Sequence, residues 1–336
     1  MTSTAAPALE TAATGSVPSR GSRARVLRLA GYALLVVAVL AMPWFTYPPV
    51  AVDILCWGLF AMALDLLLGY TGLLSFGHAA FWGGSAYVTG LVAIHLDAPY
   101  YVAVVAGAVF AMLLALPIGL LSVRRTGIYF AMVTLAFGQM IYFVANRWRG
   151  LTGGENGLQA IPKHFFGVEV VETQPFYFYY SALPLLVLAA FVAWRVVHSP
   201  FGRVLVAIRD NPDRARALGY DVSRYRVVAF VLSAGLAGTA GGVFAISHGF
   251  ASLEGVAWQT SGKVVLLAVL GGIGTLWGAL AGSAVVVSLE DQLATSGFNG
   301  TGIILGAIFV VVVLLFRRGI FGSLLLLIDR LLHRHR

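Results

Sequence analysis

The chain has 336 residues, of which 59% are hydrophobic and 11% are charged, and its mean hydropathy is +0.88. These values exclude a soluble globular protein and predict an integral membrane protein with several spans. The formal net charge of +8 is compatible with nucleic acid or with an anionic surface as a partner. Because the arginines flank apolar runs, we expect them to orient helices and to contact membrane lipid, and we expect no nucleic acid partner.

The first 28 residues precede any long apolar run. Residues 1–19 are rich in Ala, Thr, Ser and Pro, a composition that cannot repay the entropy of ordering, so residues 1–28 are predicted to form a disordered cytoplasmic tail. The arginines before the apolar run 29–45 resemble the start of a signal peptide, but no small-x-small cleavage site precedes a polar mature start. We therefore expect residues 29–45 to be retained as the first span.

Apolar runs continue along the rest of the chain. A helix that crosses ~30 Å of hydrocarbon needs about 20 mainly apolar residues. The runs that meet this condition after the first span are 50–69, 73–96, 100–121, 127–146, 176–197 and 227–248.

The region 256–290 can be one span or two short spans that turn at residues 271–274. Two spans place the C-terminal arginines on the cytoplasmic side, as the positive-inside tendency favours. With a last span over 303–316, the predicted fold is an all-α polytopic membrane protein with about ten transmembrane helices, some of them short or broken, and with both termini cytoplasmic (N-in and C-in).

Two longer loops interrupt the spans. The loop 147–175 is expected on the external side of the membrane, and the segment 198–226 is expected in the cytoplasm. All other loops are short, so no independent soluble domain fits. The predicted organisation is one transmembrane domain over 29–318, followed by a basic amphipathic cytoplasmic tail over 319–336.

The stretch GYTGLLSFGHAAF, residues 69–81, contains three glycines that interrupt a helical run. Two ionisable residues lie close to these glycines, Asp65 just before the stretch and His78 within it. Broken helices are tolerated at membrane depth where they face protein or a water-filled cavity, so this segment is predicted to line a translocation pathway. The candidate pathway residues are Ser75, Gly77, His78, Thr134 and Gln139. In the alternative interpretation, His78 bonds a neighbouring backbone carbonyl and the uncharged residues only hold helices together.

The stretch SPFGRVLVAIRDNPDRARALGYDVSRYR, residues 199–226, is too charged to lie in lipid. Apolar side chains recur in it at helical spacing, at Phe201, Leu205 and Ile208. Asn211 and Pro212 restart a second short helix, which Gly219 is well placed to end. We therefore predict two short amphipathic helices that present a compact surface to a cytoplasmic partner. The alternative is a basic loop bound to anionic lipid.

Motifs for catalysis and for energy conversion are missing from the sequence. The phosphate-binding pattern GxxxxGK[ST] fails at both lysines, since a proline precedes Lys163 and a valine follows Lys263. No HExxH occurs, GGSAY around Ser85 lacks the closing glycine of GxSxG, and Cys56 is the single cysteine. We expect no enzyme activity, no catalytic residue and no metal. A passive channel and a structural scaffold are compatible with these absences, but neither explains the patterned segment 199–226.

Four blocks of sequence follow one another along the chain. They are GYTGLLSFGHAAFWGGSAY (69–87), RRTGIYFAMVTLAFGQM with NRWRGLTGGENGL (124–158), SPFGRVLVAIRDNPDRARALGYDVSRYRVVAFVLSAGLAG (199–238) and LAVLGGIGTLWGALAGS (267–283). In this order they resemble the LivM-type permease subunits of branched-chain amino acid ABC importers. The resemblance extends over residues 50–322. Several separate blocks in the same order argue against a match by chance.

By this resemblance, the third block is the coupling segment that ABC permeases insert into a cleft of the ATPase subunit. The coupling residues that it implies are Arg203, Arg209, Asp213, Ala215 and Gly219. In the general permease pattern a Glu-Ala-Ala triplet precedes a glycine, and only Ala215 matches the triplet literally in this chain. The loop residues implied to contact an external solute-binding protein are Thr152, Gly153, Gly154 and Glu155.

The resemblance also implies a function and a set of partners. The chain is expected to be the permease subunit of an importer for branched-chain or related amino acids in the cell (inner or plasma) membrane. It would pair with a homologous permease, two ABC ATPase subunits and an external solute-binding protein. ATP and Mg²⁺ would bind to the ATPase subunits, so no cofactor is expected on this chain. Urea or short amides are the alternative cargo.

Overall fold

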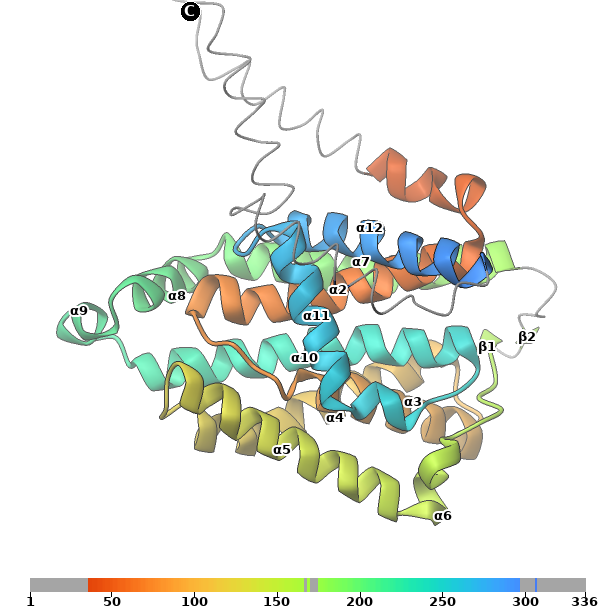
Figure 1. Ribbon diagram of the computed structural model, residues 1–336, viewed down its shortest axis with the longest axis horizontal. Helices are drawn as coiled ribbons and strands as arrows, with labels where there is room; N and C mark the ends of the chain where they lie inside the picture. The colour runs from red at the N-terminus through yellow and green to blue at the C-terminus, as the bar shows by residue number, and fades with distance from the viewer. Residues whose placement is uncertain (1–35, 166–167, 170–174, 297–305, 307–336) are drawn as a thin grey trace, which may run out of the picture. The chain divides into compact units, whose positions relative to one another are not determined.

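The computed structural model describes residues 36–165, 168–169, 175–296 and 306 (Figure 1). Apart from residue 306, three predicted segments lie outside these described residues: the tail 1–28, the last span 303–316 and the basic tail 319–336. The chain divides into two compact units, Met1–Phe45 and Thr46–Arg336. The described part of the first unit is an apolar helix, Val36–Phe45, which falls within the first predicted span.

In the second unit, six described helices are long and apolar enough to cross a membrane. They are α2 (Pro48–Thr71), α3 (His78–Leu96), α4 (Tyr100–Ser122), α5 (Ile128–Arg147), α7 (Pro175–Val197) and α10 (Val222–His248). A seventh candidate is the pair α11 (Trp258–Gly271) and α12 (Leu276–Thr295), which is bent by 113°. The predicted helical membrane fold is thus confirmed, whereas the count of about ten spans and the cytoplasmic termini stay predictions.

Short elements connect the long helices. They are α6 (Arg149–Thr152), η1 (Gly154–Asn156), β1 (His164–Phe165), β2 (Val168–Glu169), α8 (Pro200–Asp210), α9 (Pro212–Ala217) and η2 (Leu253–Val256). Strands β1 and β2 form a two-residue antiparallel pair in which His164 lies opposite Glu169. Helices α8 and α9 lie between α7 and α10, and η2 lies between α10 and α11.

Helix α2 is the centre of the second unit. It is apolar all around, and 89% of its apolar window is buried, as expected for a helix enclosed by others. It packs against α7, α10, α11 and α12. Pro48 stands in its first turn, where the missing N–H has no helical partner to lose, and Gly72 ends it in the left-handed region at φ +73°.

Helix α10 packs against α2, α3 and α4, and its glycines permit the close approach. A Cβ on Gly241 would lie 2.2 Å from the carbonyl oxygen of Trp82, and a Cβ on Gly238 would lie 2.7 Å from the Ala111 Cβ. Lipid gives apolar helices little reason to associate, so close backbone packing of this kind is a main source of their cohesion.

The two ends of the bundle differ. Helices α8 and α9 follow the C-terminus of α7 and precede the N-terminus of α10, and α8 contacts the C-terminal end of α2 (Figure 1). The N-terminal end of α2 and the C-terminal end of α10 lie at the opposite end. Along α2, Asp53 and Gly69 are separated by roughly 24 Å of helix.

Candidate functional site

Local side-chain caps divide the segment between α7 and α10 into two helices. Ser199 caps α8 by accepting a hydrogen bond on Oγ from the Gly202 N–H at 3.3 Å. Asn211 caps α9 by accepting hydrogen bonds on Oδ1 from the N–H groups of Asp213 and Arg214, at 3.1 and 2.9 Å. Asn and Ser are among the residues most favoured at this position. The two short helices predicted from the sequence are therefore present.

The coupling residues inferred from the resemblance lie in different environments. Arg203 and Asp213 are exposed, and Asp213 forms a 2.6 Å ion pair with Arg216. Ala215 is buried in a small apolar cluster with Ile208, so it packs α9 against α8 and is covered from solvent. An exposed ion pair within one short helix adds little stability, which leaves the charged face of α8 and α9 available to a partner.

Gly219 ends the segment in a conformation that other residues rarely adopt. Its φ is +89°, and a Cβ at this position would meet nothing within 4 Å. The requirement for glycine is therefore conformational and does not come from close packing.

Arg209 joins α8 to the end of α2. Its Nη1 donates a hydrogen bond to the Gly69 carbonyl oxygen at 2.5 Å, while its Nη2 forms a 3.1 Å ion pair with Asp210. The last carbonyl groups of a helix lack partners within the helix and carry partial negative charge. A guanidinium at this position therefore provides the Gly69 carbonyl oxygen with a hydrogen-bond donor and fixes α8 to α2.

The turn between α11 and α12 reaches the same place. Asp65 accepts a hydrogen bond on Oδ1 from the Gly274 N–H at 2.7 Å, and the Tyr70 hydroxyl donates to the Gly274 carbonyl oxygen at 3.0 Å. We call Asp65, Gly69, Tyr70, Arg209 and Gly274 the α2 junction. It connects α8, α2 and the bent pair α11–α12, three elements far apart in the sequence.

The predicted helix break is present between α2 and α3, because residues 72–77 are not helical. Ser75, Gly77, His78 and Thr134 are all buried there, and Gln139 on α5 is half-buried. The Thr134 Oγ1 accepts a hydrogen bond from the N–H of residue 76 at 3.3 Å, which joins the break to α5.

His78 begins α3 and is buried against α10. Its Nε2 lies 2.7 Å from the Ser233 Oγ, and the Ser233 hydroxyl donates to the Ala63 carbonyl oxygen. Because the single serine proton goes to that carbonyl, the imidazole donates from Nε2. His78 is thus linked to α2 through a hydroxyl, in place of the direct carbonyl bond considered from the sequence.

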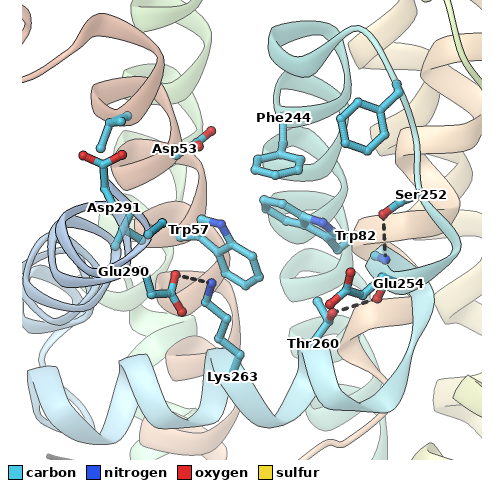
Figure 2. A pocket seen from close by; sticks show the side chains of 15 residues that line it. Asp53, Trp57, Trp82, Phe244, Ser252, Glu254, Thr260, Lys263, Glu290 and Asp291 are labelled. Atoms are coloured by element: carbon cyan, nitrogen blue, oxygen red, sulfur yellow. Dashed lines mark hydrogen bonds and ion pairs between the residues drawn. The ribbon is translucent and has the colours of Figure 1, made fainter. Parts of the chain in front are cut away.

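A pocket of about 460 Å³ opens at the other end of the bundle (Figure 2). It is lined by Val50, Asp53, Trp57, Trp82, Phe244, Phe250, Ser252, Glu254, Gly255, Thr260, Lys263, Val287, Glu290, Asp291 and Ala294. None of the five pathway residues predicted from the sequence lines it. Its volume and its mixture of aromatic and charged groups are typical of small-molecule sites.

The pocket residues come from α2, α3, α10, η2, α11 and α12 and from the loop between α10 and η2. The Trp57 and Trp82 rings stack at 5.1 Å, and Phe244 lies 5.2 Å from Trp82. Lys263 Nζ forms a 2.6 Å ion pair with Glu290 Oε2 and lies 4.1 Å from the Trp57 ring centre. At the rim, His248 Nε2 lies 2.9 Å from Asp53 Oδ1.

Sequence reasoning did not assign a site to these residues. Aromatic residues inside apolar runs look like ordinary helix packing or lipid contacts. The available signal was Lys263 with Glu290, two ionisable residues inside the run 256–290, because such residues are rare within membrane segments unless they are paired or functional.

The loop after α5 lies beside the pocket. Thr152 is buried and donates to the Ala145 carbonyl oxygen at 2.5 Å, while Gly153 and Gly154 have φ of +76° and +61° and form the turn. Glu155 is exposed on this turn. Leu158 pairs with Ala251 through two backbone hydrogen bonds of 2.9 and 2.8 Å, which connects the loop to the chain at the pocket rim.

Among the residues that the structure describes, no three His, Cys, Asp or Glu side chains lie close enough together to hold a metal ion.

Residues 49–313 match the family described as branched-chain amino acid transport system / permease component. The chain is 30% identical over 312 residues to the high-affinity branched-chain amino acid transport system permease protein LivM of Salmonella typhimurium, covering 84% of this chain and 72% of the relative. The Escherichia coli LivM is 30% identical over 285 residues, or 76% of this chain and 67% of the relative.

A shorter match is to the autoinducer 2 import system permease protein LsrC of Klebsiella pneumoniae, 37% identical over 128 residues, or 36% of this chain and 37% of the relative. No solved structure matches the chain. The apolar helices and these matches define a multi-pass permease of the inner or plasma membrane. The chain belongs to the branched-chain amino acid transport system permease family, whose members are membrane components of ABC transporters.

Proposed function

We propose that this chain is the membrane-spanning permease subunit of an ATP-driven ABC importer for branched-chain or related amino acids. An external solute-binding protein delivers the solute, a homologous permease completes the membrane pathway, and two separate ATPase subunits bind the α8–α9 surface. The family and the similarity to LivM over most of the chain support this assignment.

The observation that carries the proposal is the α2 junction. A surface that receives force must be fixed to the helices that move, and Arg209 fixes α8 to the last turn of α2. At the same place, Asp65 and Tyr70 hold the turn between α11 and α12. Displacement of α8 by an ATPase subunit is thereby transmitted to α2 and to the bent pair.

These connections give a physical basis for alternating access. Packed helices joined by a few polar bonds shift as rigid elements between discrete arrangements. The break between α2 and α3 separates α2 from the next helix over residues 72–77, so α2 can move without a continuous helix to resist it. Helices α11 and α12 then carry the displacement from the α2 junction to the pocket at the other end.

Reconstitution tests the proposal. The chain is coexpressed with its candidate partner subunits, purified through a tag and placed in liposomes with the binding protein outside. We expect ATPase subunits to copurify and labelled leucine to enter only when ATP is present at the α8–α9 side. Uptake without ATP would indicate a passive channel. ATP-driven uptake of urea in place of leucine would show that the cargo is urea and not a branched-chain amino acid.

A further inference from the structure

The pocket at the end opposite α8 and α9 has two kinds of wall. One wall is apolar and aromatic, with Trp57, Trp82 and Phe244 in mutual contact. The other wall is polar and holds the ion pair between Lys263 of α11 and Glu290 of α12 (Figure 2). Both side chains of this pair are only partly covered, with 28% and 27% of their surface exposed, so a solute in the pocket can reach them.

Lys263 shows which chemistry the polar wall accepts. Its ammonium lies 2.6 Å from a carboxylate oxygen of Glu290 and 4.1 Å from the centre of the Trp57 ring. An ammonium favours this position because the carboxylate neutralises it and the indole face attracts it. The pocket therefore already holds a primary ammonium, provided by the protein itself.

The charge balance of the pair restricts which solute can enter it. A solute with only an ammonium would displace Lys263 from Glu290, and the lysine would have to pair with another carboxylate of the lining, Asp53, Glu254 or Asp291. A solute with only a carboxylate would leave Glu290 without its counterion. A partly buried charge that loses its partner is strongly unfavourable. A solute that carries both groups can separate the pair and satisfy both of its members.

We propose that this pocket is a binding site for zwitterionic solutes that carry an ammonium, a carboxylate and an apolar group. The solute ammonium takes the place of Lys263 Nζ between Glu290 and Trp57, and the solute carboxylate pairs with Lys263. The apolar group packs against Trp82, Phe244 and Val287, which line the same pocket. This inference rests on the proposed function, since it identifies where the permease receives the amino acid.

Binding also changes how α11 is joined to α12. In the structure, Lys263 and Glu290 connect the two helices directly. With a zwitterion bound, the connection passes through the solute and the distance between the two side chains increases. The other ends of both helices meet at Gly274 in the α2 junction. A change in the distance between α11 and α12 on solute binding is therefore transmitted to α2, to which α8 is fixed.

Equilibrium binding of labelled leucine to the complete transporter in nanodiscs, without nucleotide and without the binding protein, tests the site. Leucinamide lacks the carboxylate and 4-methylpentanoate lacks the ammonium. We expect saturable leucine binding, with each analogue competing at least about tenfold less well than unlabelled leucine, because each leaves one charged hydrogen bond unmade. Equal competition by either analogue overturns the proposal, and this comparison requires no variant.

Variants locate the site. Lys263→Met and Glu290→Gln should each weaken leucine binding by about tenfold or more. The matched control is Lys163→Met, which removes the other lysine of the chain, located outside the pocket. Copurification of the ATPase subunits and an unchanged elution volume show that each variant is folded. Wild-type binding by both pocket variants overturns the proposal.

The site and the proposed function can fail separately. ATP-driven, binding-protein-dependent leucine uptake by the wild-type transporter, without any saturable leucine binding in the nanodisc assay, rejects the pocket and leaves the permease assignment standing. Absence of that uptake in a fully assembled wild-type complex rejects the proposed function itself, and with it the inference that rests on it.

Discussion

Arg209 of α8 donates a hydrogen bond from Nη1 to the Gly69 carbonyl oxygen of α2 at 2.5 Å, across 140 residues of sequence. The charged segment between α7 and α10 is thus fixed to the most enclosed helix of the second unit. The bond joins a side chain on the proposed ATPase surface to the backbone just before the helix break. In the proposed function, it is the place at which force enters the membrane helices.

Arg209→Ala removes this bond, together with the Arg209–Asp210 ion pair and one exposed charge of α8. We expect ATP-driven uptake to fall by roughly tenfold, since a hydrogen bond to a charged group contributes about 1.5–3 kcal/mol, while the ATPase subunits still copurify. Arg203→Ala is the matched variant, because Arg203 is exposed on the same helix. It should weaken copurification. Equal effects of both variants on both measurements would contradict a special role for Arg209.

Substitutions at Gly219 test the effect of backbone conformation separately from side-chain packing. Gly219 has a φ of +89° and open space around it. Gly219→Val should therefore cost roughly 1–2 kcal/mol through backbone strain and abolish uptake, while membrane insertion persists. Gly219→Asn should keep most of the activity, because Asn tolerates the left-handed region. The measurement is ATP-driven uptake at matched membrane levels of each variant. Normal uptake by the valine variant would count heavily against the assignment of this segment.

A substitution at Gly77 tests the effect of close packing against α5 separately from backbone strain. A Cβ on Gly77 would lie 2.3 Å from the Thr134 carbonyl oxygen, and no left-handed φ is involved. Gly77→Ala should therefore destabilise the break by roughly 1–3 kcal/mol through overpacking, seen as a lower apparent midpoint of thermal unfolding in detergent. Gly262→Ala is the control, since a Cβ there meets nothing within 4 Å. A break that tolerates alanine would show that α5 is free to move away.

Ser233 tests the buried link between α10, α3 and α2. Ser233→Ala leaves the Ala63 carbonyl oxygen and His78 Nε2 without the hydroxyl that joins them. The expected loss of stability is about 1–3 kcal/mol, measured by thermal unfolding in detergent. Thr239→Ala on the same helix is the control, because Thr239 Oγ1 only donates back to the Gly235 carbonyl oxygen of its own helix. An equal shift for both variants would exclude a special role for the Ser233 link.

Much of the fold followed from local signals in the sequence. Hydropathy located the six long described helices, glycines marked the break after residue 71, and Ser199 and Asn211 marked the starts of α8 and α9. Each of these features depends on residues within a few positions of one another, so the sequence pattern contains the necessary information.

The long-range features could not be predicted in the same way. The Arg209–Gly69 bond and the Asp65–Gly274 bond each join residues more than a hundred positions apart, and nothing in a single sequence pairs them. The same holds for Trp57 and Trp82 in the pocket, which resemble any aromatic residues in an apolar helix. Asp65 was expected to accompany the break, and the structure shows instead that it holds the turn between α11 and α12.

The most direct measurement of the central claim is disulfide crosslinking between α9 and an ATPase subunit. Cys56 is buried, so it contributes little background. In the assembled transporter, Asp213→Cys should crosslink to a cysteine in the cleft of the ATPase subunit, and the crosslink should stop ATP-driven leucine uptake reversibly. Glu155→Cys, in the loop beside the pocket, should form no such crosslink. If Glu155→Cys crosslinks to the ATPase subunit and Asp213→Cys does not, the account is contradicted.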